Sequence, residues 1–127
     1  MYEVGVVEQF EGAHRLSGNF GAATRTHGHT YRVELVVRGQ HLRDDGTLCD
    51  IGQLGDALRA AIGELDHQNL DVLPVFSGRN TTAEIVAEHL LDRVTPAIDV
   101  HGLAGIMIRV WESPGAFAAF ERMLTDR

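Results

Sequence analysis

The chain has 127 residues, 44% of them apolar, and this size and composition suit a single globular domain over residues 1–127. Its formal net charge of −7 disfavours nucleic acid as a partner, and no apolar run approaches the roughly 20 residues that span a bilayer. All 11 basic residues are arginine, and the absence of lysine excludes Schiff-base and PLP catalysis and a Walker-type phosphate loop.

Two segments in the first third of the chain have the alternating pattern of half-buried strands. Residues 2–14 place apolar side chains on one parity and acidic or amide side chains on the other, which predicts a first strand. Residues 29–39 alternate in the same way and predict a second strand. Gly39 and the run RDDG at 43–46 then mark a turn.

Two helices are predicted in the middle of the chain. Asp50 has the character of an N-cap, and Gln53 three residues later completes a capping-box pattern. Apolar residues at helical spacing follow this cap. A second amphipathic helix begins at Thr81 or Thr82 and ends before Pro96.

The last third returns to strand patterns. Residues 106–111 alternate, the dipeptide Pro114-Gly115 makes a turn, and Ala116–Leu124 is the final predicted strand. The element order is therefore β-β-α-α-β-β. Such grouping predicts an α+β fold in which two helices cover one face of an antiparallel sheet.

Histidine is the residue type that most needs an explanation, since seven occur in this short chain. His27 and His29 open the second strand, and side chains two residues apart on a strand point to the same face. Both imidazoles can therefore meet one metal ion. Taken alone, the pair is equally compatible with a polar strand end.

A third histidine favours the metal site. His14 shares parity with the apolar face of the first strand, and antiparallel pairing across the loop 15–26 would bring it beside His27 and His29. Three neutral imidazoles that leave one position open are typical of a catalytic zinc site. Because Cys49 is the only cysteine, a thiolate zinc cluster is excluded.

Several motifs resemble those of one enzyme family. Residues 10–16 read FEGAHRL, and residues 27–31 read HGHTY, similar to the family pattern H-G-H-x-(Y/F). Weaker matches follow in the family's order: Gly46 to Asp50, residues 65–67, Asn80-x-Thr82-x-Glu84 and Glu112. Together they resemble the 6-pyruvoyl- and 6-carboxy-tetrahydropterin synthases, and the glutamate after Phe10 is more like the bacterial 6-carboxy branch.

This resemblance implies a T-fold (tunnelling fold) and a homo-oligomer, commonly a hexamer, with active sites at subunit interfaces. It implies a small-molecule substrate, dihydroneopterin triphosphate, whose side-chain hydroxyls meet a Zn2+ ion held by His14, His27 and His29. The metal acts in such a site as a Lewis acid that acidifies a bound alcohol. We expect a cytoplasmic protein with neither nucleic acid nor membrane as a partner.

The resemblance also assigns roles to five further residues. Glu112 would accept two hydrogen bonds from the pterin, and Thr82 would line the same pocket. Glu84 would either join them or complete a capping box that begins at Thr81. Asp66 and His67 would form the pair that moves a proton, although a polar helix end is the alternative.

One position departs from the family. The cysteine base that stands four residues before the first histidine of H-G-H is replaced by Ala23, which cannot accept a proton. Three hypotheses follow: a zinc-dependent pterin lyase with altered chemistry, a catalytically inactive pterin-binding homologue, or a structural oligomer that binds metal incidentally.

Overall fold

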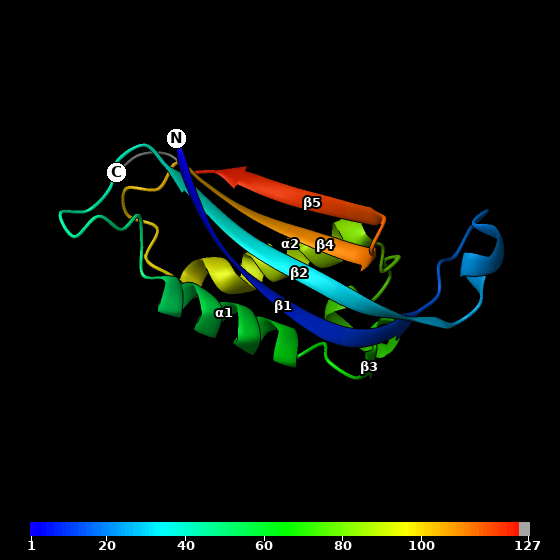
Figure 1. Ribbon diagram of the computed structural model, residues 1–127. Helices are drawn as coiled ribbons and strands as arrows, with labels where there is room; N and C mark the ends of the chain where they lie inside the picture. Colours follow the sequence, from blue (N-terminus) through cyan, green and yellow to red (C-terminus); the bar gives the residue numbers. More distant parts are fainter. Residues whose placement is uncertain (125–127) are drawn as a thin grey trace.

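The predicted order of strands and helices is confirmed by the computed structural model, which describes residues 1–124 (Figure 1). The long strands are β1 (Tyr2–His14), β2 (His27–Gly39), β4 (Gly105–Ser113) and β5 (Ala116–Met123). The helices are α1 (Ile51–Gly63) and α2 (Ala83–Val94). Shorter elements are the strand β3 (Gln68–Asn69) and the 3-10 helices η1 (Gly21–Thr24), η2 (Leu70–Val72), η3 (Pro74–Phe76) and η4 (Thr95–Ala97).

The strands form one five-stranded sheet in the order β3-β1-β2-β4-β5. The four long strands pair antiparallel with one another, and the pairing of β1 with β2 runs without interruption from Tyr2 opposite Gly39 to His14 opposite His27. The two-residue strand β3 adds to the edge in parallel with β1 and has no signal in the sequence. It fixes the chain after α1 against the end of β1.

Both α-helices lie on the same face of the sheet, and the core fills the space between them and the strands (Figure 1). Every second side chain of β2 from Tyr31 to Val37 is buried, as the alternation predicted. The helices contribute one apolar stripe each, which includes Leu54 and Leu58 of α1 and Val86 and Leu90 of α2. Within residues 1–124, no helix is both long and apolar enough to cross a membrane.

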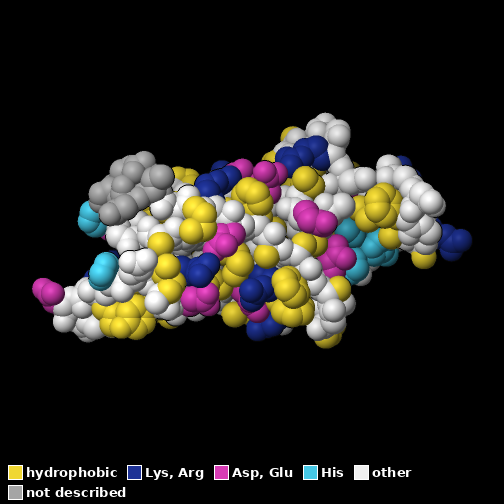
Figure 2. All heavy atoms as spheres, turned by 90° about the horizontal axis from the view of Figure 1, so that it is seen from above, with side chains coloured by type: hydrophobic (Ala, Val, Ile, Leu, Met, Phe, Trp, Pro, Cys, Tyr) yellow, Lys and Arg dark blue, Asp and Glu magenta, His cyan; other side chains and the backbone are white. Residues whose placement is uncertain are grey.

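The opposite face of the sheet is not covered by helices. Apolar, acidic and basic side chains are interleaved over it, and histidines gather at the end from which the loop 15–26 projects (Figure 2). Glu34 is the centre of one charged group, with Arg109 Nη1 at 2.7 Å and Arg32 Nη1 at 3.1 Å from its carboxylate oxygens. Glu34 is thus in contact with two arginines on this face.

The N-terminus of α1 confirms one half of the predicted capping box and corrects the other. Asp50 caps the helix, because its Oδ1 accepts hydrogen bonds from the backbone N–H groups of Gly52 (2.9 Å) and Gln53 (3.3 Å). The Gln53 side chain does not return to Asp50. Its Oε1 accepts instead from the backbone N–H of Asp99 at 2.9 Å, so it ties α1 to the segment before β4.

We predict that Asp50→Ala lowers the free energy of unfolding by about 1 kcal/mol, because two N–H groups of the first turn lose their acceptor. Chemical denaturation measures this loss. Asp44→Ala, which removes the same charge from an exposed position in the preceding turn, should stay within about 0.5 kcal/mol of wild type. Equal losses in the two variants would contradict the capping role.

Candidate metal centre

The three predicted histidines converge at the end of the β1–β2 pair. His14 stands directly opposite His27 in the strand register, and His29 follows two residues later on the same face. Their ring centroids lie 4.6 to 5.1 Å apart, and one ligand nitrogen from each ring lies within 4.8 Å of the other two. The arrangement can hold a single metal ion.

Hydrogen bonds at Nδ1 of His14 and of His27 determine which ring nitrogen is available to bind a metal ion. His14 Nδ1 lies 2.7 Å from the backbone oxygen of Thr81, and His27 Nδ1 lies 2.7 Å from the backbone oxygen of Arg25. A carbonyl oxygen can only accept, so Nδ1 carries the proton in both rings and Nε2 keeps its lone pair. His29 Nε2 is buried without a partner in the described chain. This donor set fits a metal ion, because each ring has an unprotonated or unpartnered nitrogen to offer.

The electrostatic surroundings of His29 favour its neutral form. Burial lowers the pKa of His29, nearby Glu112 opposes this shift, and the neighbouring His14 and His27 lower the pKa further. A neutral imidazole is the form that binds metal. Beneath it, Tyr31 stacks on Phe10 with ring centroids 4.6 Å apart. Burial raises the pKa of Tyr31, so its hydroxyl keeps its proton.

Glu112 lies next to this centre. It is half-buried at the end of β4, where the pairing with β5 shifts register between Trp111 and Ser113. Its charge acts on both His29 and Tyr31, so the carboxylate and the three imidazoles lie at the same end of the molecule. Recognition of a pterin by Glu112 stays a prediction.

The start of α2 corrects the capping box predicted for Thr81 and Glu84. Thr82 is the N-cap, and its Oγ1 accepts from the backbone N–H of Ile85 at 3.3 Å. The Thr81 hydroxyl faces the other way and donates to Asp71, 2.8 Å away. Glu84 is exposed and lines a hollow of about 140 Å³ together with Glu112. Its place is therefore beside Glu112 rather than in a cap.

Asp66 and His67 form a contact pair outside the histidine centre. Asp66 Oδ1 lies 3.0 Å from His67 Nδ1 and accepts from the backbone N–H of Glu11 at 2.9 Å. These hydrogen bonds, the one from Glu11 first, lower the pKa of Asp66. His67 has a backbone φ of 59°, which is strained for a residue with a side chain, and its backbone N–H donates to Glu11 O at 2.7 Å.

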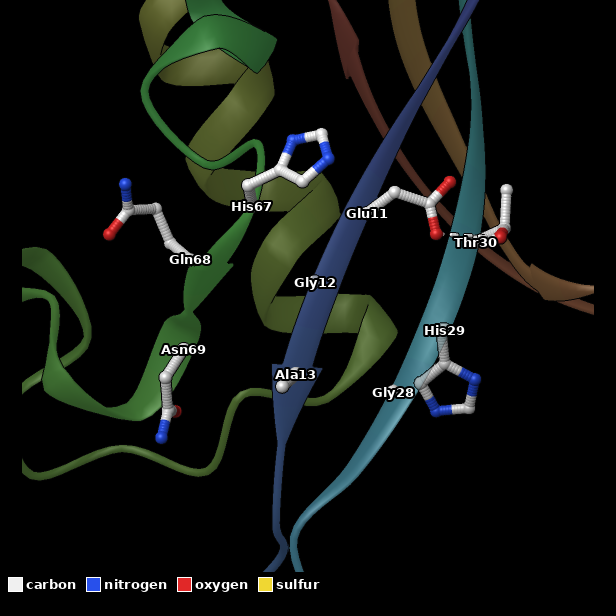
Figure 3. A pocket seen from close by; sticks show the side chains of 9 residues that line it. All are labelled: Glu11, Gly12, Ala13, Gly28, His29, Thr30, His67, Gln68 and Asn69. Atoms are coloured by element: carbon white, nitrogen blue, oxygen red, sulfur yellow. Dashed lines mark hydrogen bonds between the residues drawn. The ribbon is translucent and has the colours of Figure 1, made fainter.

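Within one chain, the strand β1 separates this pair from the three histidines of the candidate metal centre. His67 lies on the side of β3, whereas His29 projects from β2 beyond β1 (Figure 3). Both residues border an open hollow of about 450 Å³, but the His67 side chain is 76% exposed. A single chain therefore presents Asp66 and His67 outward.

The two positions relevant to a thiol base lie far apart. Ala23 is half-buried in η1, in the loop that joins His14 to His27, and its backbone oxygen accepts from the Leu16 N–H at 2.9 Å. Cys49 is buried just before α1. The neighbouring Leu48 packs against Gly39, at the end of the β1–β2 pair opposite to His14 and His27. Burial raises the pKa of its thiol, which keeps it protonated.

The family model and the similar proteins of known name all point to the same enzyme family. The family model described as 6-pyruvoyl tetrahydropterin synthase matches residues 3–123. The 6-carboxy-5,6,7,8-tetrahydropterin synthase of Bacillus subtilis is 30% identical over 106 residues, which cover 79% of this chain and 70% of that protein. The 6-pyruvoyl tetrahydrobiopterin synthase of Dictyostelium discoideum is 28% identical over 103 residues, covering 72% and 76%.

Solved structures agree on the fold. The 6-pyruvoyl tetrahydropterin synthase of Plasmodium falciparum matches with a TM-score of 0.82 over 97% of this chain and 98% of that chain, at 24% identity. The corresponding protein of Caenorhabditis elegans gives the same TM-score at 22% identity. These matches confirm the predicted T-fold.

We predict that the double variant His27→Ala, His29→Ala loses stoichiometric metal, because one imidazole cannot hold an ion that needs three. Metal content is measured after purification without chelator and dialysis against zinc. The control is His41→Ala, His101→Ala, which removes two exposed histidines at the other end of the molecule and should keep about one ion per chain. Full metal content in the first variant would refute the site.

Proposed function

The chain belongs to the 6-pyruvoyl tetrahydropterin synthase family, and from this membership we propose that it is a zinc-dependent lyase acting on 7,8-dihydroneopterin triphosphate or a related dihydropterin. The observation that carries the proposal is the convergence of His14, His27 and His29 beside Glu112. Zinc bound by these three imidazoles would supply a Lewis acid that acidifies a hydroxyl of the substrate side chain.

Glu112 is the residue that would recognise the pterin ring. A pterin presents its 2-amino group and a ring N–H side by side, and a carboxylate can accept both in a bidentate pair. Glu112 is half-buried at the end of the strand, where an unpaired carboxylate costs free energy. A ligand that donates two hydrogen bonds to it, as a pterin does, would therefore be preferred over one that does not. Thr82 and Glu84, at the start of α2, would line the same pocket, since Glu84 and Glu112 already share a hollow.

Asp66 and His67 would move the proton. Asp66 fixes the ring of His67 through Nδ1, which leaves Nε2 free to accept a proton from the substrate hydroxyl. The strained backbone of His67 supports a functional role, because strain of this kind persists where geometry matters to activity. Since β1 stands between this pair and the metal centre of its own chain, we infer that it serves the centre of a neighbouring copy in a homo-oligomer.

Ala23 limits the chemistry that these residues can perform. Alanine provides no second base, so the proposed reaction is a cleavage of the substrate side chain that needs only one proton acceptor, His67. A second candidate is a pterin-binding protein without turnover, which the same alanine favours. Product formation separates the two, because both bind pterin and only the lyase releases a product.

We predict that Glu112→Gln weakens binding of dihydroneopterin about 30-fold or more, since removing one partner of a buried charged pair typically costs about 2–5 kcal/mol. Calorimetry on the zinc-loaded protein measures the affinity. Glu3→Gln changes an exposed glutamate at the far end of β1 and should bind as wild type does. Equal affinities in wild type and Glu112→Gln would exclude this residue as the pterin anchor.

We further predict that wild type is about 10²–10⁴-fold slower than the cysteine-containing relatives in forming 6-pyruvoyl- or 6-carboxy-tetrahydropterin, because general-base catalysis contributes that much. Ala23→Cys should recover part of this rate, measured by product mass at matched zinc content. Ala22→Cys places a thiol at the adjacent exposed position and should recover none.

The outcomes of this assay discriminate between the hypotheses. A wild-type rate as high as that of the relatives would mean that another residue supplies the second base. Tight pterin binding without turnover by wild type or Ala23→Cys would favour the binding protein over the lyase.

A further inference from the structure

The ring of His14, one of the three proposed metal ligands, is hydrogen-bonded to Thr81, and Thr81 is hydrogen-bonded to the carboxylate of Asp71. We propose that Asp71, acting through Thr81, is a positioning residue that holds His14 in the orientation and tautomer needed for metal binding. Neither Asp71 nor Thr81 had a metal-related signal in the sequence. The inference rests on the proposed metal centre and adds to it the groups that determine its affinity.

The contacts of His14 carry the inference. His14 and Thr81 are both buried, with 1% and 0% of their surfaces exposed. His14 Nδ1 lies 2.7 Å from the Thr81 backbone oxygen and 3.1 Å from Thr81 Oγ1. One N–H group of His14 thus faces two acceptors of the same residue, which restrain the ring and leave Nε2 as the nitrogen available to a metal ion.

The direction of the protons follows from the acceptors. Thr81 Oγ1 lies 2.8 Å from Asp71 Oδ1, and an ionised carboxylate can only accept, so the threonine hydroxyl donates to Asp71. The oxygen of Thr81 is then free to accept from His14 Nδ1–H. A hydrogen bond that ends on a charge is stronger than a neutral one and polarises the bond before it. The chain from His14 through Thr81 to Asp71 therefore makes His14 Nε2 a better electron donor to a metal.

Asp71 also fixes the backbone next to the ligand. Its second oxygen, Oδ2, accepts from the backbone N–H of Arg15 at 2.8 Å. The carboxylate is itself held in η2, where Asn69 Oδ1 accepts from the Asp71 N–H at 3.0 Å. One side chain thus restrains both the ring of His14 and the residue that follows it.

His27 provides a contrast within the same centre. Its Nδ1–H is bound by Arg25 O, only two residues away, so the loop itself orients that ring. His14 is oriented by a segment 67 residues later in the chain. This long-range contact makes the metal affinity of the centre depend on Thr81 and, through it, on Asp71.

A purely structural role for these residues makes a different prediction from a positioning role. If they only satisfy buried polar groups, their replacement lowers stability and leaves the metal affinity of the folded protein unchanged. If they position His14, metal affinity falls by more than the change in stability explains. Zinc affinity and stability of the metal-free protein must therefore be measured on the same variants.

The test compares Thr81→Val, Thr81→Ser and Asp71→Asn with wild type, using competition of a chromophoric chelator for Zn2+ and thermal unfolding of the metal-free protein. Thr81→Val and Asp71→Asn should bind zinc about 10-fold more weakly, the lower end of the range typical when the partner of a metal-bound histidine is lost. The effect is limited because the backbone oxygen of Thr81 still accepts from His14 Nδ1 in both variants. Thr81→Ser keeps the hydroxyl and should bind close to wild type. Asp56→Asn removes the same charge from an exposed site on α1 and should have no effect.

Two further measurements test whether Asp71 acts on His14 through the hydroxyl of Thr81. Because Thr81 and Asp71 act in one chain of hydrogen bonds, the double variant should lose less affinity than the sum of the single losses. The absorption spectrum of bound Co2+ should change in Thr81→Val and not in Thr81→Ser, since it reports the ligand geometry. Asp71 lies in a half-buried position, so Asp71→Asn keeps the test open if Thr81→Val does not fold.

The failures of the two proposals are distinguishable. Wild-type zinc affinity in both Thr81→Val and Asp71→Asn would overturn the positioning role while leaving the metal centre intact. Absence of zinc binding by wild type itself would overturn both. Weak binding by Asp56→Asn to the same degree would show that net charge, and not the hydrogen-bond chain, governs the affinity, and would also overturn the inference.

Discussion

The unbroken antiparallel pairing of β1 with β2 is the constraint on which the rest of the molecule depends. Because side chains alternate along a strand, one continuous register decides at once which side chains enter the core and which histidines meet. A slip of one residue would turn Phe10 and His14 to the open face and separate them from Tyr31 and His29. The core and the cluster of three histidines thus occupy two ends of the same face of the sheet.

The change from apolar to polar side chains along this face explains why hydrogen bonds fix the orientation of the imidazole rings. Phe10 and Tyr31 stack at the end of the core, and the imidazoles follow directly beyond them. Polar groups next to an apolar core are costly unless each has a partner. Thr81 and Arg25 satisfy Nδ1 of two rings through their backbone oxygens. One ligand nitrogen from each of the three rings lies within 4.8 Å of the other two.

The second polar group, Asp66 with His67, lies outside this apolar face. It is built on the edge of the sheet, where β3 pairs with β1 and the backbone of Glu11 holds both residues. Its exposure and its separation from the histidines mean that one chain does not assemble all the groups that the proposed reaction needs. An oligomer in which copies complete one another's sites would account for both features.

Local periodicity by itself determined the four long strands, the two helices and the convergence of His14, His27 and His29, because these follow from side-chain spacing within a segment and from one antiparallel pairing. Only the tertiary structure decided the roles of Thr81, Gln53 and Asp71. The sequence offered a capping box for Thr81 and for Gln53, and no role for Asp71. In the folded chain the three side chains instead contact segments far away in the sequence. Likewise, the formation of β3 and the position of His67 at the edge of the sheet depend on where the chain meets β1 after α1. Such contacts between distant segments leave no periodic pattern, so they become visible only when the chain is folded.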